Sequence, residues 1–304
     1  METSALLYIL YSRATNVYDV NIISTGSQGN CVVIDHSIMC DCGLSKKKVS
    51  ELGYDLNQLK VLLISHKHAD HTRLPFIRWA LKNGVQVRVP QSVIEMLDKE
   101  GLIDTHEYLD VNLFVHHPSD DYQFTLPCEY DEQDEPVETE KVKISVHPQK
   151  HHDIVNYAFV IEKETNHQTE RLLYSTDLDT IEPTDVGPGL VSLGMFDTLI
   201  LEGNYDEVWL REYIDTAIGA VDPELDPSIM NDKDLDHWVR ENYHQLPRSM
   251  SAAMFRAVQN MRHLSKQQAR MYAANHLKRG GRYFEVHRSS MFYEKPSDWT
   301  SLHF

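Results

Sequence analysis

The chain has 304 residues, of which 41% are hydrophobic, so it is long enough to bury a substantial core in a single domain over 1–304. Its formal net charge of -17 argues against a protein that coats nucleic acid indiscriminately, because an acidic surface repels phosphate. The four cysteines form no pattern typical of secreted disulfide-bonded proteins, so we expect a cytoplasmic protein with reduced thiols.

The first predicted elements are short apolar strands. Residues 5–11 are too few to cross a bilayer and follow no basic residue, so we expect a strand there rather than a signal peptide or a membrane anchor. Further strands are predicted at 20–24, 31–35 and 38–44. The polar turn at 25–30 contains two glycines, which permit close approach of the backbone.

Four side chains that can bind metal follow directly after the next apolar run, residues 61–64. This run is typical of a buried strand, because it is short and β-branched at both ends. Where such a strand leaves its sheet, His66 and His68 can turn to the same side, while Asp70 and His71 face the gap from the start of a helix. The spacing predicts two metal centres, one at each pair. Imidazole favours zinc-like ions, and carboxylate favours harder ions such as manganese.

This motif resembles the signature of the metallo-β-lactamase-fold hydrolases, in which an αββα sandwich holds one or two divalent ions at the sheet ends. Two further motifs, Ser-Thr-Gly-Ser-Gln-Gly-Asn at 24–30 and Asp-Cys-Gly-Leu-Ser at 41–45, narrow the resemblance to the YycJ (WalJ) branch of that fold. The branch is associated with metal-dependent exonuclease activity on DNA and has phage-borne relatives. The resemblance implies that Asp41 supports the metal-binding loop without binding metal itself.

Helices and strands alternate in the next part of the chain. Helices are predicted at 72–83 and 92–99 with a strand at 86–90 between them, which indicates a layered α/β fold. The stretch at about 118–141 is rich in acid, and we expect a strand-connecting loop or an exposed hairpin there, without a function. The predicted fold class is therefore α/β, an αββα sandwich of the metallo-β-lactamase type.

A polar segment at 148–157 lies between two predicted strands and should supply the third nitrogen of the first metal centre. By their positions in the chain, three residues could supply this nitrogen: His147, His151 and His152. The phage-like relatives of the branch carry His-Asp-x-x-Asn before an aromatic residue or glycine and a strand, and His152 begins such a segment here. We therefore choose His152, which we expect to face the cleft, and we keep His151 as its competitor, expected to point away.

A strand predicted from residue 171 ends in a Ser-Thr-Asp turn, and the family pattern has its bridging aspartate in such a context. The resemblance thus implies that Asp177 bridges the two ions, with Asp179 as the alternative reading, a turn cap. Another strand is predicted at 196–202. Beyond it Tyr205 replaces a histidine of the YycJ proteins, so the resemblance carries over no role for that histidine.

The segment from about 206 to 261 is longer than the resemblance accounts for. It places aromatic residues among acidic ones and contains three prolines, so we expect helices with breaks. This insertion before the last strand could cap the active site, make an oligomer contact or only pack against the domain.

The last part of the chain carries two more candidate histidines. A His-Leu-Ser motif begins at His263 as in the YycJ branch, and by resemblance this side chain lies near the substrate groove. Ser265 is also the N-cap of a helix predicted at 266–278, which stops at a Gly-Gly pair. A strand at 283–286 follows. The fold draws the last ligand of the second ion from the end of that strand, so His287 is that ligand by resemblance.

The predicted site holds two divalent ions, zinc or manganese, with His66, His68 and His152 on one ion, Asp70, His71 and His287 on the other, and Asp177 between them. A hydroxide that bridges the ions would attack phosphorus. The catalytic candidates are Asp70, Asp177 and His263, and the candidates for substrate contact are Arg262, Arg288 and Ser289.

The expected function is that of a phosphodiesterase or nuclease with a nucleic acid or nucleotide substrate and no membrane partner. Two other enzyme classes stay open, namely a hydrolase of cyclic nucleotides or other small phosphodiesters and a lactone or thioester hydrolase. A metal-stabilised binding module without catalysis is a further alternative. The complete ligand set argues against it, because a degenerate member would be expected to lose a ligand.

Overall fold

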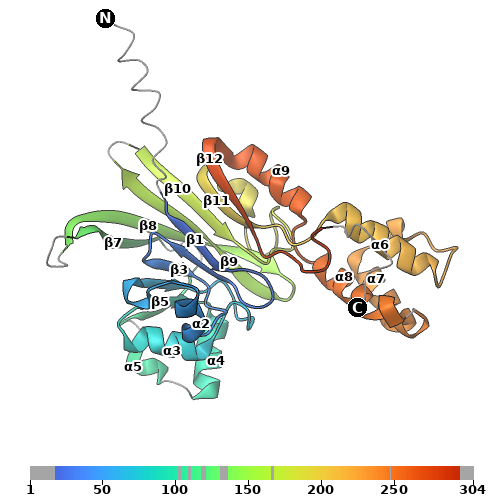
Figure 1. Ribbon diagram of the computed structural model, residues 1–304, viewed down its shortest axis with the longest axis horizontal. Coiled ribbons are helices and arrows are strands. Elements are labelled where there is room, and N and C mark those ends of the chain that lie inside the picture. Colours follow the sequence, from blue (N-terminus) through green and yellow to red (C-terminus); the bar gives the residue numbers. More distant parts are fainter. Residues whose placement is uncertain are drawn as a thin grey trace, which may run out of the picture.

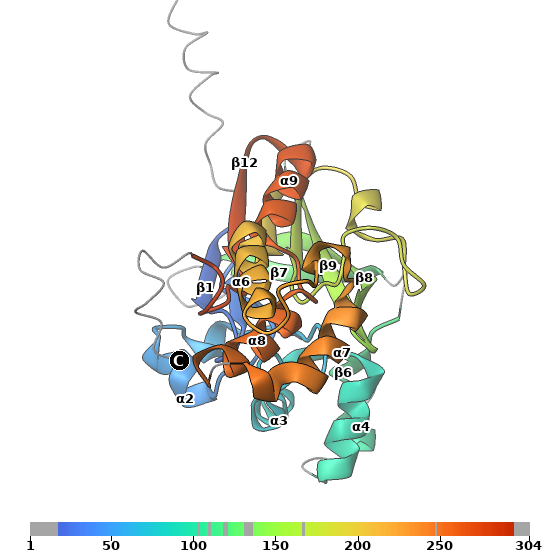
Figure 2. The same ribbon diagram turned by 90° about the vertical axis from the view of Figure 1, so that its right-hand side faces the viewer.

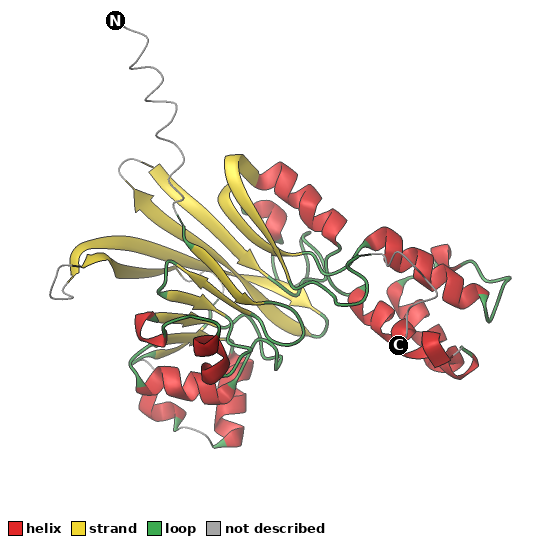
Figure 3. Ribbon diagram, viewed as in Figure 1, coloured by secondary structure: helices red, strands yellow, loops and turns green. Residues whose placement is uncertain are grey.

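The computed structural model describes residues 18–101, 104–108, 111–117, 121–130, 136–165, 168–246 and 248–294. Two six-stranded sheets pack face to face, and helices lie on their outer faces (Figures 1 and 3). The α/β class and the αββα sandwich expected from the sequence are therefore confirmed. The strand predicted at 5–11 lies outside the described residues.

The first sheet contains the short strands of the N-terminal half in sequence order: β1 (Val20–Ser24), β2 (Cys31–Ile34), β3 (Ile38–Cys40), β4 (Val61–Leu63), β5 (Gln86–Val89) and β6 (Leu113–Val115). The pairs β1·β2 and β2·β3 are antiparallel, and the later pairs are parallel. Its outer face is covered by the helices α2 (Lys46–Glu51), α3 (Leu74–Lys82), α4 (Gln91–Glu100) and α5 (Thr105–Tyr108) and the 3₁₀ turn η1 (Leu56–Gln58) (Figure 1).

The second sheet contains longer strands, in the order β12-β11-β10-β9-β8-β7: β7 (Asp121–Tyr130), β8 (Pro136–His151), β9 (Ile154–Thr165), β10 (Gln168–Ser175), β11 (Phe196–Glu202) and β12 (Leu277–Val286). From β7 to β10 the pairing is antiparallel, and β10·β11 and β11·β12 are parallel. Helix α9 (Lys266–His276) packs with the 3₁₀ turn η2 (Leu190–Ser192) on the outer face.

Alternation of side chains along the strands explains how the layers form. In β4, Val61 and Leu63 point to the core between the sheets, whereas Leu62 and the following Ile64 point to the helices that cover the first sheet. All four are buried, as expected for a parallel strand that is covered on both faces. The strand is therefore fixed in the sandwich, and the metal-capable residues start where it ends.

The segment after β11 forms a helical lobe that projects beyond the ends of the strands (Figures 1 and 2). We call it the α6–α8 lobe: α6 (Glu207–Gly219), α7 (Asp232–Asn242) and α8 (Arg248–Asn260), with the 3₁₀ turns η3 (Pro227–Ile229) and η4 (Tyr243–Gln245). It has its own apolar cluster, in which Trp209, Val239 and Met254 meet Phe292 from the C-terminal loop. The expectation of a helical insertion before the last strand is confirmed.

Of the two alternatives for the acidic stretch, the structure shows the hairpin where the stretch is described, because β7 and β8 pair along it. The end of the last helix differs from the prediction. The last helix ends at His276, and the Gly-Gly pair lies inside β12. Leu277 already pairs with Phe196, and Thr198 next pairs with Arg282, so Gly280, with φ +83°, belongs to a bulge. Strand pairing has overridden the helical pattern there.

Among the helices of the described residues, none combines the length and the apolar character needed to cross a membrane.

Candidate metal centre

The candidate site lies where strands of both sheets end, in the loops that gather between the sheets and the α6–α8 lobe (Figure 3). The loop after β4 is a tight turn. The amides of His71 and Thr72 donate to the His68 carbonyl at 3.0 and 2.8 Å, and the Thr72 hydroxyl donates to the His66 carbonyl at 2.6 Å. These bonds fix the backbone between the two halves of the motif, so its four metal-capable side chains point into one region.

A first group of possible ligand atoms consists of His66, His68, His151 and Asp177, which lie within 4.8 Å of one another. The Nε2 atom of His66 is 3.1 Å from Asp177 Oδ2 and 3.0 Å from His68 Nδ1. Burial lowers the pKa of His66 to about 4, against the opposing effect of Asp177. The ring is therefore neutral at pH 7, which is the form of imidazole that binds metal.

A second group consists of Asp70, His71, Asp177 and His287. Asp177 Oδ2 lies 2.7 Å from His71 Nε2, and Asp177 Oδ1 lies 3.0 Å from His287 Nδ1. Asp70 Oδ2 is 3.6 Å from the Nε2 atoms of both histidines. Asp177 is thus shared by the two groups, which is the position that a bridging carboxylate requires.

Unpaired polar atoms in this region fit a pair of cations. His151 Nδ1, Asp177 Oδ1 and His287 Nε2 are buried and make no well-aligned hydrogen bond within the described part of the chain, although Asp177 Oδ1 lies 3.0 Å from His287 Nδ1. A buried polar group without a partner costs roughly 1–3 kcal/mol, so three of them in one place indicate atoms kept for a ligand. Imidazole nitrogens with carboxylate oxygens are donors that zinc and manganese accept.

Both His151 and His152 line the pocket, but the first group of possible ligands contains His151 and not the predicted His152. His151 is buried and joins His66, His68 and Asp177, whereas His152 groups only with His151 and His263. Residues 142, 144 and 146 of β8 are buried, but beyond Pro148 the buried positions are 149 and 151. His152 follows in the hairpin turn with φ +53°, and its amide donates to Asp179 at 2.9 Å. Asp179 therefore caps the turn, which is the role that the sequence suggested for it as an alternative to bridging the ions.

The structure places Asp41 against the ring of His71. Its carboxylate lies 2.7 Å from His71 Nδ1 and accepts hydrogen bonds from the Ser65 amide at 2.8 Å, the Ser65 hydroxyl at 2.9 Å and the Tyr174 hydroxyl at 2.8 Å. All of these groups are buried. This contact fixes the ring so that its Nε2 faces Asp177, an arrangement that also occurs around bound metals.

A glycine allows the loops of Asp41 and Asp70 to touch. A Cβ atom on Gly43 would lie 1.8 Å from the Asp70 carbonyl oxygen, a distance that no side chain can accept. We expect Gly43→Ala to push the metal-binding loop outward, to lower the free energy of unfolding by about 1–3 kcal/mol and to reduce the bound metal. Thermal unfolding and metal analysis test this. Gly219→Ala, with no atom within 4 Å of its Cβ, is the matched control.

Glu202 is a site residue that sequence reasoning missed. It is fully buried at the end of β11 and accepts hydrogen bonds from the amides of Asp177 and Leu178, and from Leu264 at 2.7 Å. Asp177 has the left-handed φ of +54°, which is unfavourable for this residue type, and the buried bonds to Glu202 hold it there. A lone acid at the end of an apolar run was the available signal.

His263 lies between two carboxylates. Its Nδ1 is 3.3 Å from Asp177 Oδ1 and 3.4 Å from Glu202 Oε2. Burial acts to lower the pKa of His263, but Glu202 and Asp177 outweigh burial and raise it to about 10. The two carboxylates therefore favour the protonated form of this imidazole, which lies at the edge of the metal-ligand groups.

A pocket of about 420 Å³ contains these groups. Its lining includes the three predicted substrate contacts Arg262, Arg288 and Ser289, together with Arg256 from α8, which was not predicted. Arg256, Arg262 and Arg288 bring three positive charges to the mouth of the site, although the whole chain has a net charge of -17.

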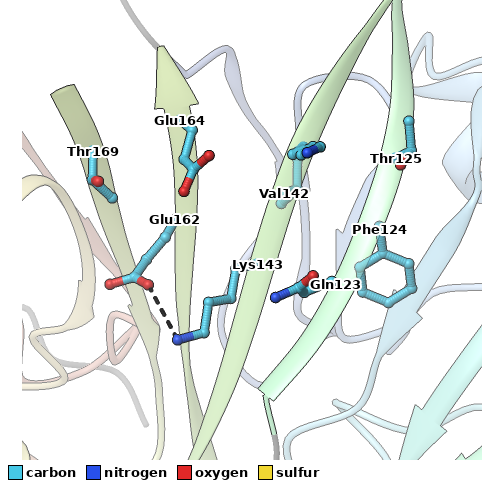
Figure 4. A pocket seen from close by; sticks show the side chains of 9 residues that line it. Gln123, Phe124, Thr125, Val142, Lys143, Glu162, Glu164 and Thr169 are labelled. Carbon is cyan, nitrogen blue, oxygen red and sulfur yellow. Dashed lines mark ion pairs between the residues drawn. The ribbon is translucent and has the colours of Figure 1, made fainter. Parts of the chain in front are cut away.

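A second pocket, of about 490 Å³, lies on the outer face of β7–β10 and away from this centre (Figure 4). One of its charged groups, Lys143, pairs with Glu162 across the pocket and with Asp121 beside it. Lys143 Nζ is 2.8 Å from Asp121 and 3.8 Å from Glu162. None of the possible metal-ligand groups of the described residues reaches this pocket, and its lining is that of a solvated sheet face.

Comparison with known proteins places the chain in a family. The model of the beta-lactamase superfamily domain matches residues 36–234, which is more than half of the chain. Among solved structures, human tRNase Z, short form (ELAC1), is similar at 13% identity and a TM-score of 0.47, over 92% of this chain and 96% of that one. The metallo-beta-lactamase fold protein YhfI from Bacillus subtilis is similar at 14% identity and a TM-score of 0.44, over 89% of this chain and 96% of that one.

The search of curated proteins gave no match. The family model covers β3 to the start of α7 and with them most of the residues that form these two possible metal-ligand groups. His287 and β12 lie beyond the matched residues and complete the second group and the second sheet. By the family match and its two-sheet fold, this chain belongs to the metallo-β-lactamase superfamily.

Proposed function

We propose that this protein is a metal-dependent phosphodiesterase that acts on nucleic acid, in the manner of a DNA exonuclease. The observation that carries the proposal is one pocket in which two possible metal-ligand groups share Asp177 and arginines face the same space. Arginine binds phosphate through a planar fork of donors, so the pocket suits a phosphodiester better than a neutral lactone. The resemblance of three motifs to the YycJ branch supports DNA as the substrate, and the buried free cysteines 31, 40 and 42 support a cytoplasmic location.

The ligands that we assign follow the two groups. His66, His68 and His151 would hold the first ion, Asp70, His71 and His287 would hold the second, and Asp177 would serve both. When bound, two zinc or manganese ions lower the pKa of a water molecule and stabilise the entering and leaving oxygens of a phosphoryl group. No side chain has to serve as the nucleophile.

The chain's own residues position this chemistry. Asp41 holds the ring of His71, and Glu202 holds the backbone of Asp177 and the ring of His263. His263 lies beside Asp177 and would serve as the proton donor to the leaving oxygen when the P–O bond breaks. Arg262 and Arg288 contact the phosphate oxygens from the rim of the pocket, and Ser289 lies beside them.

An activity panel tests the proposal. With manganese or zinc, the purified protein should hydrolyse single-stranded or double-stranded DNA faster than RNA, cyclic nucleotides or acyl-homoserine lactones. His68→Ala should abolish that activity, because it removes one nitrogen of the first centre. Hydrolysis of lactones alone, or of cyclic nucleotides alone, would contradict the assignment to nucleic acid. DNA hydrolysis that His68→Ala leaves intact would show that the metal centre is wrongly assigned.

A further inference from the structure

The α6–α8 lobe brings one face of α8 to the metal pocket. Arg256, Gln259 and Asn260 are three and four residues apart, so they lie on one side of the helix, and all three line the pocket. The opposite side contributes Met254 and Val258 to the apolar core of the lobe. The helix is therefore built with a polar, basic side that faces the site and an apolar side that fixes it to the lobe.

The lobe is tied to the loops of the metal centre. Asn260 Nδ2 donates to Ser289 Oγ at 2.8 Å, and the Ser289 amide donates to the Asn204 carbonyl at 2.7 Å. Asn204 Nδ2 in turn donates to the His287 carbonyl at 2.9 Å. Phe292, three residues beyond Ser289, is fully buried in the lobe core. Through these contacts α8 and the ligand loop hold a fixed relation, so the backbone of Arg256 has a fixed place beside the pocket.

The three arginines differ in how far they are neutralised. Arg262 lies 3.8 Å from Asp236, and Arg288 lies 4.0 Å from Glu285. Arg256 is exposed, and no acidic group of the described residues lies within 4.0 Å of it. Its charge is therefore directed at whatever enters the pocket. The acids that line the pocket are Asp70 and Asp177, which the proposed ions would neutralise.

We propose that the basic side of α8, led by Arg256, binds phosphates of a single-stranded polynucleotide next to the scissile one. The lobe thereby selects polynucleotides over small phosphodiesters. A small diester fills the space at the proposed ions and leaves the arginine of α8 without a partner, whereas a strand presents further phosphates to it. A pocket of about 420 Å³ has the size of small-ligand sites, so it admits one strand end and not a duplex. This inference rests on the proposed function.

The first test compares two substrates in one variant. We expect Arg256→Gln to lower kcat/KM for a short single-stranded oligonucleotide by about tenfold relative to kcat/KM for bis(p-nitrophenyl) phosphate, mainly through KM. Arg211→Gln on α6 is the matched control. Arg211 is exposed, pairs with Glu207 at 3.4 Å and does not line the pocket, so the ratio should not move. An unchanged ratio in Arg256→Gln would overturn the inference.

A measurement of oligonucleotide binding tests this inference independently of the proposed function. With fluorescein-labelled single-stranded oligonucleotide, Arg256→Gln should weaken the anisotropy-measured affinity and lower the slope of log K against log salt by about 0.7, the loss of one phosphate contact. If the wild type hydrolyses DNA but Arg256→Gln binds with unchanged affinity and slope, the inference fails and the function stands. If the wild type hydrolyses no phosphodiester but Arg256→Gln still loses affinity, the function fails and the binding surface stands.

Discussion

His151→Ala should lose the ion of the first centre and nearly all hydrolysis, whereas His152→Ala should keep both. His151 is buried, its Nδ1 has no hydrogen-bond partner among the described residues, and it joins His66, His68 and Asp177. Removing one nitrogen from a three-nitrogen centre opens a coordination position, so the loss of metal affinity should exceed the roughly 10–100-fold typical of residues that only support a ligand. His152 is in a turn, and its ring is partly exposed.

The two variants should be compared at the same metal concentration, with metal content and hydrolysis of one DNA substrate measured for each. Both change a histidine to alanine within one hairpin, so a general effect of the substitution would appear in both. Loss of metal and activity in His152→Ala, with an active His151→Ala, would show that the first centre uses the residue predicted from the sequence instead.

Asp177→Asn should release metal from both centres and lower hydrolysis by more than about 100-fold. The amide keeps the volume of the carboxylate, so packing around β10 is retained, but the negative charge shared by the two groups is lost. Asp177 Oδ2 lies close to both His66 and His71, and Oδ1 lies close to His287, so no other described side chain could replace it in both groups.

Asp179→Asn is the matched control, because Asp179 lies two residues away, belongs to neither ligand group and accepts the His152 amide at 2.9 Å; its Oδ1 also lies 3.6 Å from His151 Nδ1, but the amide keeps an oxygen there. It should retain two ions and most of the activity. Thermal unfolding of both variants shows whether each is folded. A folded Asp177→Asn protein with two ions and full activity would remove the basis for a shared carboxylate.

The sequence was most informative where local pattern determines geometry. An apolar strand followed by His66, His68, Asp70 and His71 predicts four side chains around one gap, and the structure brings them together. His287 and Asp177 were placed by resemblance, at the ends of strands, and both lie in the second group. Strand ends that meet at one edge of the sandwich explain why widely separated residues could be placed in one site.

Elsewhere the determining contacts are too distant in the chain to be read from local pattern. His152 was chosen because its segment matches the His-Asp-x-x-Asn pattern of the phage-like relatives, but the buried positions of β8 change from 142, 144 and 146 to 149 and 151 beyond Pro148. The contacts that make Glu202 a site residue are with amides 25 and 62 residues away in the chain, so its only local signal was an acid at the end of an apolar run. The C-terminal limit of α9 was set by pairing with β11, a contact with Phe196 that a helical pattern does not contain.

Anomalous X-ray diffraction from crystals grown with manganese or zinc tests the central claim most directly, because it locates the ions independently of activity. We predict two peaks, one on each side of the Asp177 carboxylate. The first should lie within ligand distance of His66, His68 and His151. The second should lie within ligand distance of Asp70, His71 and His287. A single peak, or a peak among His151, His152 and His263, the competing group of nitrogens in this pocket, would contradict a two-ion centre bridged by Asp177.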